Sequence, residues 1–249
     1  MAYSPKTNWR NNDIVTPNDL NRIERGIAES SSPSDDIVFY ISPDGSDTTG
    51  TGDGNTPFRT IQKAIDSFPT SNNESKLFVI KIAEGQYPGF TMSTPKKVEV
   101  SVVGNVQIMG DVVLNAGTLF FADETDAGVY IMDSRIIMTG GELISMIQLA
   151  VTTSTQIEAV DTIAVDCSCG SKLSVHSELI VTHHTTAVKC SHSTITLKRM
   201  MTDATPTGVI CECGIVQIGD DVIQASAAKF VTQDGGRIYV GAQTNMPNY

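Results

Sequence analysis

Basic residues are scarce in this sequence. Its 249 residues include 17 Lys and Arg against 28 Asp and Glu, which gives a net charge of −11. A field of that sign repels phosphate backbones and anionic membrane surfaces. We therefore expect no nucleic-acid partner.

Long apolar runs are also missing. The opening MAYSPKTNWR lacks the apolar core of a secretion signal, and no window reaches the roughly 18 apolar residues that a membrane span needs. We expect a chain that is made in a cytosol and is not inserted into a membrane. In such a reducing compartment, the odd number of cysteines, five, argues against a disulfide framework.

Aromatic residues amount to only 6% of the chain, and its single tryptophan is Trp9. Stacking on a sugar would have to rely on Tyr130, Tyr239 and a few phenylalanines. The composition therefore gives little support to an aromatic-lined saccharide groove.

What the sequence does contain is a repeat. Three segments align, AVDCSCGSKLSV, AVKCSHSTITL and GVICECGIVQI, and the steps between their first cysteines are 23 residues (190 − 167) and 21 residues (211 − 190). A looser copy, KFVTQDGGRIYV, places Phe230 or Val231 at the cysteine position. The three aligned columns are Val165, Val188 and Val209; then Cys167, Cys190 and Cys211; then Cys169, His192 and Cys213.

Each copy alternates apolar and polar residues, turns at Gly or Ser, and alternates again, which is the pattern of β-strands. Short strands that repeat at this interval leave no room for crossover helices and predict a solenoid. We therefore predict an all-β fold, a right-handed single-stranded parallel β-helix over residues 77–249, preceded by a capping segment over 37–76 and an attachment segment over 1–36.

Equivalent positions of neighbouring coils lie about 4.8 Å apart. The valine column and the first cysteine column should line the core, where a free cysteine behaves as a small hydrophobe. Cys169, His192 and Cys213 have two interpretations, a metal site or a row without metal. Zinc requires a tetrahedron of ligands and a straight row does not provide one, so we favour the row and expect no cofactor.

Residues 1–36 differ in kind from the repeats. A capping box at Thr16 predicts a helix that runs to about Glu29, with Leu20, Ile23 and Ile27 at 3-4 spacing. A helix this short is not stable alone. It should pack on copies of itself or on a docking partner, or else fold back on the β-domain.

Residues 37–76 should close the open end of the solenoid, because the first coil otherwise exposes its apolar interior. A strand is predicted over residues 37–42 and a helix is predicted to open at Thr56 and Pro57. Turn chemistry explains the intervening aspartates better than calcium does, because their spacing departs from the EF-hand pattern. The apolar face of the helix comprises Phe58, Ile61, Ala64, Ile65 and Phe68.

Two stretches resemble known proteins. YISPDGSDTTGTGDGNTPFRTIQKAID is similar to the entry segment of pectate-lyase-like β-helices in phage tailspikes, and TNWRNNDIVTPNDLNRIERGI resembles the opening of tail and baseplate appendages of phages and phage-tail-like particles of Gram-positive bacteria. Together they cover roughly the first 70 residues. The resemblance implies a homotrimer located in a virion, with other tail or baseplate proteins and host cell-wall polysaccharide as partners. The attachment residues would be Trp9, Leu20, Ile23 and Ile27.

Many members of this family cut polysaccharide, a reaction that uses paired carboxylates. Glu178 and either Asp220 or Asp221 fall two coils apart, about 9.6 Å, near the upper end of the range used by inverting glycosidases. The alternative is an exposed ladder of acid, Arg199 and acid without a catalytic role, and we favour it. The expected function is a virion appendage that contributes to host attachment. A polysaccharide depolymerase and a purely structural connector remain the alternatives.

Overall fold

A computed structural model describes residues 36–69, 77–123, 128–153, 162–203, 205–224 and 229–241, together with Thr16 and Asn21. The chain divides into two compact units, residues 1–36 with 72–76, and residues 37–71 with 77–249. The predicted attachment helix therefore lies outside the described residues, as do Trp9, Leu20, Ile23 and Ile27.

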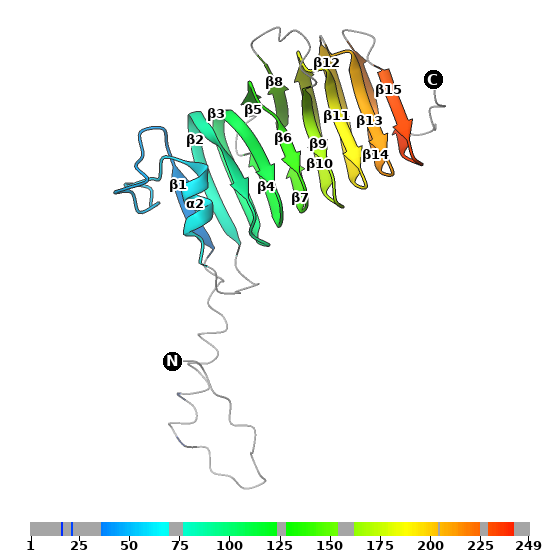
Figure 1. The fold of residues 1–249 in the computed structure, drawn as a ribbon. Helices are drawn as coiled ribbons and strands as arrows, with labels where there is room; N and C mark the ends of the chain where they lie inside the picture. Colours follow the sequence, from blue (N-terminus) through cyan, green and yellow to red (C-terminus); the bar gives the residue numbers. More distant parts are fainter. Residues whose placement is uncertain are drawn as a thin grey trace. The chain divides into compact units, whose positions relative to one another are not determined.

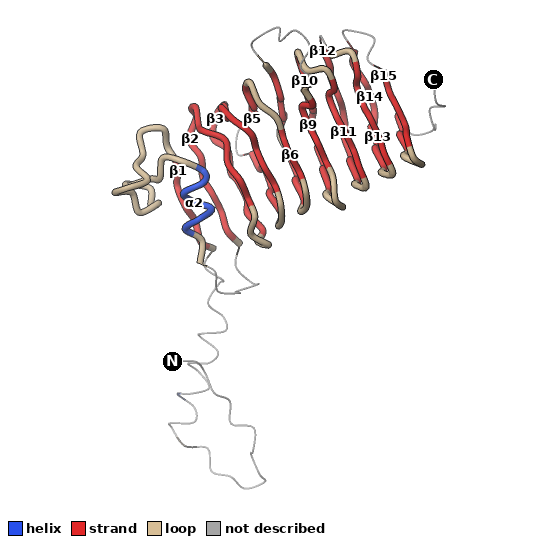
Figure 2. Tube along the Cα trace, viewed as in Figure 1, coloured by secondary structure: helices blue, strands red, loops and turns tan. Residues whose placement is uncertain are grey.

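The second unit is a parallel β-helix. Its sixteen described strands join in one continuous sheet, and each strand pairs in parallel with the equivalent strand of the next coil (Figure 1). The predicted all-β solenoid is confirmed, with one short helix at its beginning (Figure 2). The early strands are β1 Ile37–Ile41, β2 Phe78–Met92, β3 Lys97–Leu114, β4 Thr118–Asp123, β5 Gly128–Met132, β6 Ile136–Met138, β7 Glu142–Ser145 and β8 Gln148–Thr152. The later strands are β9 Ile163–Cys167, β10 Lys172–Thr182, β11 Thr186–Ser191, β12 Thr194–Asp203, β13 Thr207–Glu212, β14 Ile215–Gln224, β15 Lys229–Gln233 and β16 Arg237–Val240.

The sheet winds through three faces. Strand β3 shows this directly, because successive parts of it pair with β4, β5 and β6. Register shifts mark the bends inside long strands, for example between Val175 and Glu178 in β10. The first face comprises β1, β4, β7, β16 and the first parts of β2, β3, β10, β12 and β14. The second face comprises β5, β8, the middle of β2 and β3, and the later parts of β10, β12 and β14. The third face comprises the ends of β2 and β3 together with β6, β9, β11, β13 and β15.

The core is built from ladders of like side chains on the third face. Val188 lies in register between Val165 and Val209, and Cys190 lies between Cys167 and Cys211, as the repeat predicts. All six side chains are fully buried. Because neighbouring coils lie about 4.8 Å apart, each of these side chains packs on the equivalent side chain of the next coil. The repeated valine and cysteine positions therefore line the interior of the tube.

The last copy of the repeat corrects one expectation. Phe230 or Val231 was expected at the cysteine position, but Thr232 pairs with Cys211 and Phe230 pairs with Val209. From Val209 to Glu212 the pairing keeps the 21-residue interval of the preceding copy, so the cysteine position falls on Thr232 (232 − 211 = 21). The looser sequence of this copy had suggested a shorter interval.

We expect two fast-reacting thiols and three protected ones in the native protein. Cys169 and Cys213 are exposed, whereas the three core thiols are buried. Burial, with the nearby charge of Asp166, raises the pKa of Cys167 to about 12. A hydrogen bond with Cys211, followed by burial, raises the pKa of Cys190.

The same hydrogen bond lowers the pKa of Cys211, but this side chain has no exposed surface, so a reagent reaches it only after unfolding. Titration with a chromogenic disulfide reagent, with and without denaturant, measures both classes. A third fast thiol in the folded protein would contradict the core ladder.

A short helix closes the N-terminal end of the tube. Helix α2, Ile61–Ser67, buries Ile61, Ala64 and Ile65 against the first coils. The predicted start at Thr56 and Pro57 was wrong, because Thr60 is the N-cap and accepts a hydrogen bond from Lys63 N. Phe58 instead pairs with β1 in a parallel bridge and donates its N–H to Tyr40 O. Because Phe58 is extended and paired with β1, the helix can begin only after this residue.

Two aspartates hold the loop between β1 and α2. Asp47 accepts hydrogen bonds from Arg59 N (2.8 Å) and from the N–H and hydroxyl of Thr60 (3.1 and 2.7 Å). Asp53 accepts from the Thr51 hydroxyl (2.6 Å) and from the N–H and hydroxyl of Thr56 (2.9 and 3.1 Å). Both carboxylates are used inside the loop, which fits turn chemistry.

The carboxylate of Asp53 should remain ionised in acid. The Thr51 hydroxyl, then the backbone N–H groups of Asn55 and Thr56, lower its pKa to about 2. Because an unfolded aspartate titrates near 3.9, the loop gains stability from this group above about pH 4 and loses it as the pH falls toward about 2. NMR titration of the carboxyl carbon should give a midpoint near 2 in the wild type. A midpoint near 4 would show that these hydrogen bonds do not form in solution.

Candidate functional site

A polar ladder crosses the second face. Glu178 on β10, Arg199 on β12 and Asp221 on β14 are register partners in three successive coils. Arg199 Nη1 lies 3.9 Å from Glu178 Oε1, and Gln148 Nε2 donates to Glu178 Oε2 at 3.2 Å. The Tyr130 hydroxyl donates to Gln148 Oε1 at 3.3 Å and extends the ladder by one coil. The side chains of Asp220 and Asp221 lie outside the described part of the structure.

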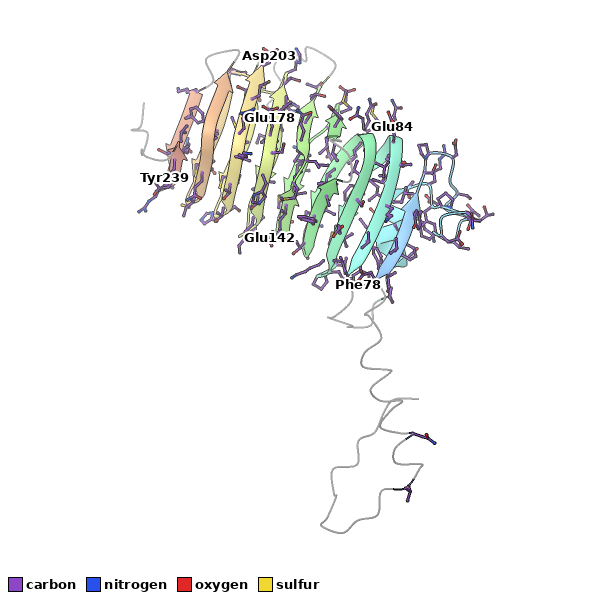
Figure 3. The ribbon with its side chains drawn as sticks, turned by 180° about the vertical axis from the view of Figure 1, so that it is seen from behind. Phe78, Glu84, Glu142, Glu178, Asp203 and Tyr239 are labelled. Atoms are coloured by element: carbon purple, nitrogen blue, oxygen red, sulfur yellow. The ribbon has the colours of Figure 1, made fainter. Side chains whose placement is uncertain are left out.

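This ladder holds Glu178 firmly. Its side chain is only 17% exposed, and both carboxylate oxygens have partners, Gln148 on one side and Arg199 on the other. The contact with Arg199, which is 47% exposed, contributes little to stability but fixes the orientation of both groups. The site therefore presents an ordered row of hydrogen-bonding groups along the tube axis. Figure 3 shows Glu178 on the tube, apart from Glu142, which belongs to the first face.

The ladder is poorly arranged for glycoside hydrolysis. An inverting enzyme needs a sugar and a water between its acid and its base, which lie 6.5 to 9.5 Å apart. Here Arg199 occupies the register position between Glu178 and Asp221. A guanidinium-bearing residue therefore stands at the register position where such an enzyme needs room for substrate and water.

An apolar row borders this ladder. Tyr130, Ala150, Ile180 and Met201 occupy successive register positions, two residues further along the same strands. Ala150 is buried although it points outward, because its larger neighbours cover it. Polar groups beside an apolar row form the combination that saccharides and extended peptides require, since both carry polar edges and apolar surfaces.

Sequence reasoning missed Tyr130 and Gln148 as members of the ladder. Both lie upstream of the clear repeats, and ten residues, 153–162, separate β8 from β9 in the same coil as Gln148. That long connection hides the period that would have aligned Gln148 with Glu178.

The third cysteine column forms one corner of the tube. Cys169, His192 and Cys213 are all exposed and all adopt left-handed backbone conformations, with φ of 55°, 51° and 50°. Gly170 N donates to His192 O, and Cys213 Sγ donates to Asp234 O, so the column is joined mainly through backbone oxygens. Among the described residues no three His, Cys, Asp or Glu side chains converge as metal ligands. The row does not form the tetrahedron that zinc requires.

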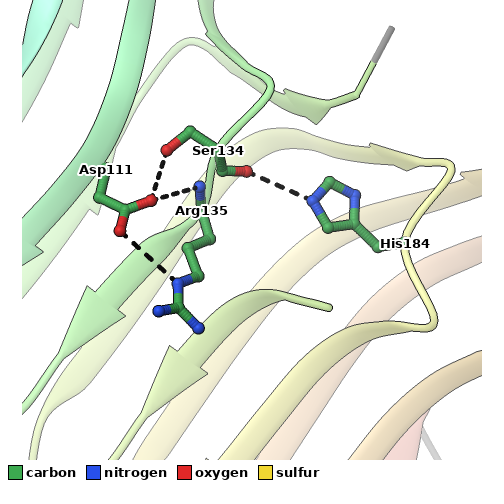
Figure 4. A network of polar contacts seen from close by, with 4 residues as sticks. All are labelled: Asp111, Ser134, Arg135 and His184. Carbon is green, nitrogen blue, oxygen red and sulfur yellow. Dashed lines mark hydrogen bonds and ion pairs between the residues drawn. The ribbon is translucent and has the colours of Figure 1, made fainter. Parts of the chain in front are cut away.

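A second polar cluster joins coils at the corner between the second and third faces (Figure 4). Asp111 accepts a hydrogen bond from the Ser134 hydroxyl at 2.5 Å and pairs with Arg135 Nε at 3.6 Å. His184 Nε2 lies 3.3 Å from Ser134 O, and its Nδ1 lies 2.9 Å from Thr182 O. His184 is almost fully buried and reaches a residue 50 positions earlier. His184 and Ser134 belong to two different coils, and the coil between them in the sequence contains the ten-residue connection 153–162. The sequence did not indicate this structural role of His184.

Comparisons of the chain with models of protein families, with curated proteins and with solved structures give no match. Within the described residues, no helix has the length and apolar character needed to cross a membrane.

Proposed function

We propose that the protein is an external appendage of a virion, a homotrimer fixed to the particle by its N-terminal segment and contributing to attachment to the host cell surface. The observation that carries the proposal is the entry segment. The stretch whose sequence resembles tailspike entry segments folds as strand β1, an aspartate-bound loop and the capping helix α2. The attachment segment, whose sequence resembles the opening of phage tail appendages, immediately precedes it.

The β-helix suits this role mechanically. Strands inside the tube are hydrogen-bonded to the coil on either side, so the tube is a stiff shaft. Its faces offer repeated side chains along the whole length, as the polar ladder of Tyr130, Gln148, Glu178 and Arg199 illustrates. Three copies held together would multiply weak surface contacts through avidity.

Imaging tests the virion role. A compact tag fused to the C-terminus, viewed by electron microscopy on particles made by the encoding phage or bacterium, should appear as density at a fixed external position. Free tag in the medium and bare particles would refute the role. Binding of purified wild-type protein to host cells, without release of reducing sugar, would support attachment.

A depolymerase is the second candidate, because Glu178 and Asp221 lie two coils apart on one face. Its test is release of reducing ends from host cell-wall polysaccharide by the wild type, by Glu178→Gln and by Asp221→Asn. Glu212→Gln is the matched control, since Glu212 lies on the third face and bonds Ser191. Release that is lost in the first two variants and retained in the control would establish this enzyme. If neither binding nor release occurs, the structural connector remains.

A further inference from the structure

Four sulfur-bearing side chains lie in a row inside the tube. Met138, Cys167, Cys190 and Cys211 are register partners on the third face, in strands β6, β9, β11 and β13. All four side chains are fully buried. Figure 1 shows these strands in order toward the C-terminal end, with β15 after them. We refer to the four residues as the sulfur column, in which each sulfur lies one coil from the next.

The sulfur column consists of two pairs. Cys167 Sγ lies 3.6 Å from Met138 Sδ, so the Cys167 thiol points toward the coil before it. Cys190 and Cys211 are the other pair, because their thiols share a hydrogen bond. Equivalent Cα atoms of neighbouring coils are about 4.8 Å apart, within the range of roughly 4.4 to 6.8 Å that a disulfide spans. Of the two cysteines next to Cys190, Cys211 is therefore the one placed to form a disulfide with it.

The thiols of the column differ in their reactivity. The hydrogen bond from Cys190 lowers the pKa of Cys211, because a thiolate accepts this bond better than a thiol does. Burial, with the nearby charge of Asp166, raises the pKa of Cys167 to about 12, so this group stays protonated. The thiolate is the form of cysteine that attacks an oxidant. Cys211 should therefore react first, with the thiol of Cys190 next to it.

Access to Cys211 is controlled by strand β15, which covers β13 and is the last strand of the third face in the described part of the chain. None of the five residues of β15 is buried. Segments that bury few side chains open locally at a lower free energy than the rest of a domain. Opening of β15 uncovers Cys211, whereas Cys167 remains covered by β11 and β13.

We propose that Cys190 and Cys211 are an oxidation site, at which hydrogen peroxide that enters when β15 opens joins the two coils by a disulfide. The Cys211 thiolate attacks one oxygen of the peroxide, the O–O bond breaks, and hydroxide leaves and takes up a proton to become water. The Cys190 sulfur then displaces the hydroxyl group from the sulfenic acid of Cys211 and loses its proton. The S–S bond forms and a second water is released. The two thiols supply the two electrons that reduce the peroxide.

The disulfide would hold the C-terminal end of the tube together. It joins β11 to β13 and links residues 21 positions apart (211 − 190), which restricts the unfolded chain. A chain that is made in a reducing cytosol keeps both thiols, whereas an oxidising medium allows the disulfide to persist. The site itself depends only on the β-helix. Its use as a lock that closes after release from the host rests on the proposed function.

Mass spectrometry after treatment with hydrogen peroxide tests the proposal. Cys169→Ser with Cys213→Ser is the parent variant, because it removes both exposed thiols and keeps the sulfur column. The folded parent variant should lose two hydrogens and yield a pair of peptides joined at Cys190 and Cys211. Its third thiol, Cys167, should remain free for alkylation in denaturant.

Two further substitutions in the parent variant identify the partners. Cys167→Ser is the matched control and should form the same disulfide, whereas Cys190→Ser should form none. Circular dichroism shows whether each variant is folded, and the peptide map of the parent variant decides the pairing if Cys190→Ser does not fold. A disulfide from Cys190 to Cys167, or a folded parent variant that forms no disulfide on prolonged treatment, would overturn the proposal.

The rate of disulfide formation tests the route of entry. Phe230 on β15 and Phe39 on β1 are both partly buried and pack against the core in the last and first coils. In the parent variant, Phe230→Ala should speed disulfide formation at least roughly threefold, because it loosens β15. Phe39→Ala should leave the rate unchanged. An unchanged rate for Phe230→Ala, or equal acceleration by both substitutions, would rule out entry through β15.

Discussion

Val188→Asp should prevent the chain from folding. Val188 is fully buried between Val165 and Val209, where a carboxylate has no polar partner in the valine column and no access to water. An unpaired buried charge destabilises by about 4 to 5 kcal/mol or more, which is from about a third to all of the 5 to 15 kcal/mol that typically holds a domain. Urea denaturation followed by circular dichroism measures the loss, or shows that no transition remains.

Thr196→Asp provides the matched control for this substitution. It introduces the same charge at a half-buried outward position, between Ser174 and Gln217. We expect a change within about 1 kcal/mol, because the carboxylate stays in water. Equal losses in the two variants would mean that inward and outward positions have been assigned incorrectly.

Phe68→Ala should produce the second large effect, a fall in the melting temperature of about 10 °C. Phe68 closes the end of the core, with its ring centroid 5.0 Å from that of Phe39 and 4.6 Å from that of Phe78. Removing a buried phenylalanine ring typically costs about 3 to 5 kcal/mol, and each kcal/mol lowers the melting temperature of a chain of this size by about 2 to 4 °C. Calorimetry measures the shift.

The same substitution should also promote aggregation, because an uncapped solenoid exposes its first coil. Arg59→Ala is the control, since only its backbone N–H takes part in the hydrogen bond to Asp47. It should melt within about 2 °C of the wild type. An unchanged melting temperature for Phe68→Ala would show that the helix does not seal the core.

The later coils could be predicted from the sequence because they are regular. Val165, Val188 and Val209 recur at nearly equal intervals, and the pairing of β9, β11 and β13 follows from that interval alone. In a stacked parallel sheet, residues that are one repeat interval apart in the sequence are neighbours in space, so the interval is enough to predict the contact.

The early coils could not be divided in the same way. Strand β3 runs for 18 residues, and Gly104 and Gly110, both with positive φ, mark its two bends. Without a repeat like that of the later coils, these glycines do not reveal that the segments between them form three faces of one coil. Helix α2 begins at Ile61 rather than near Pro57, because Phe58 is first used in pairing with β1. Such boundaries depend on tertiary pairing, which local helix signals do not encode.

The candidate site was predicted in part. The positions of Glu178 and Arg199 follow from the repeat, whereas the contributions of Tyr130 and Gln148 could not be aligned with it, because the ten residues 153–162 between β8 and β9 change the sequence interval. The contact of His184 Nε2 with Ser134 O joins residues 50 positions apart, which is more than two repeat intervals. Contacts between residues 50 positions apart cannot be read from a period of about 22.

Methyl NMR of selectively labelled valine tests whether successive coils lie in register. We expect strong methyl–methyl NOEs from Val188 to Val165 and to Val209, because these residues are adjacent in the stack at about 4.8 Å. Val165 and Val209, about 9.6 Å apart, should show a much weaker direct NOE. Absence of both NOEs from Val188 in the folded protein would contradict the β-helix and every proposal that depends on it.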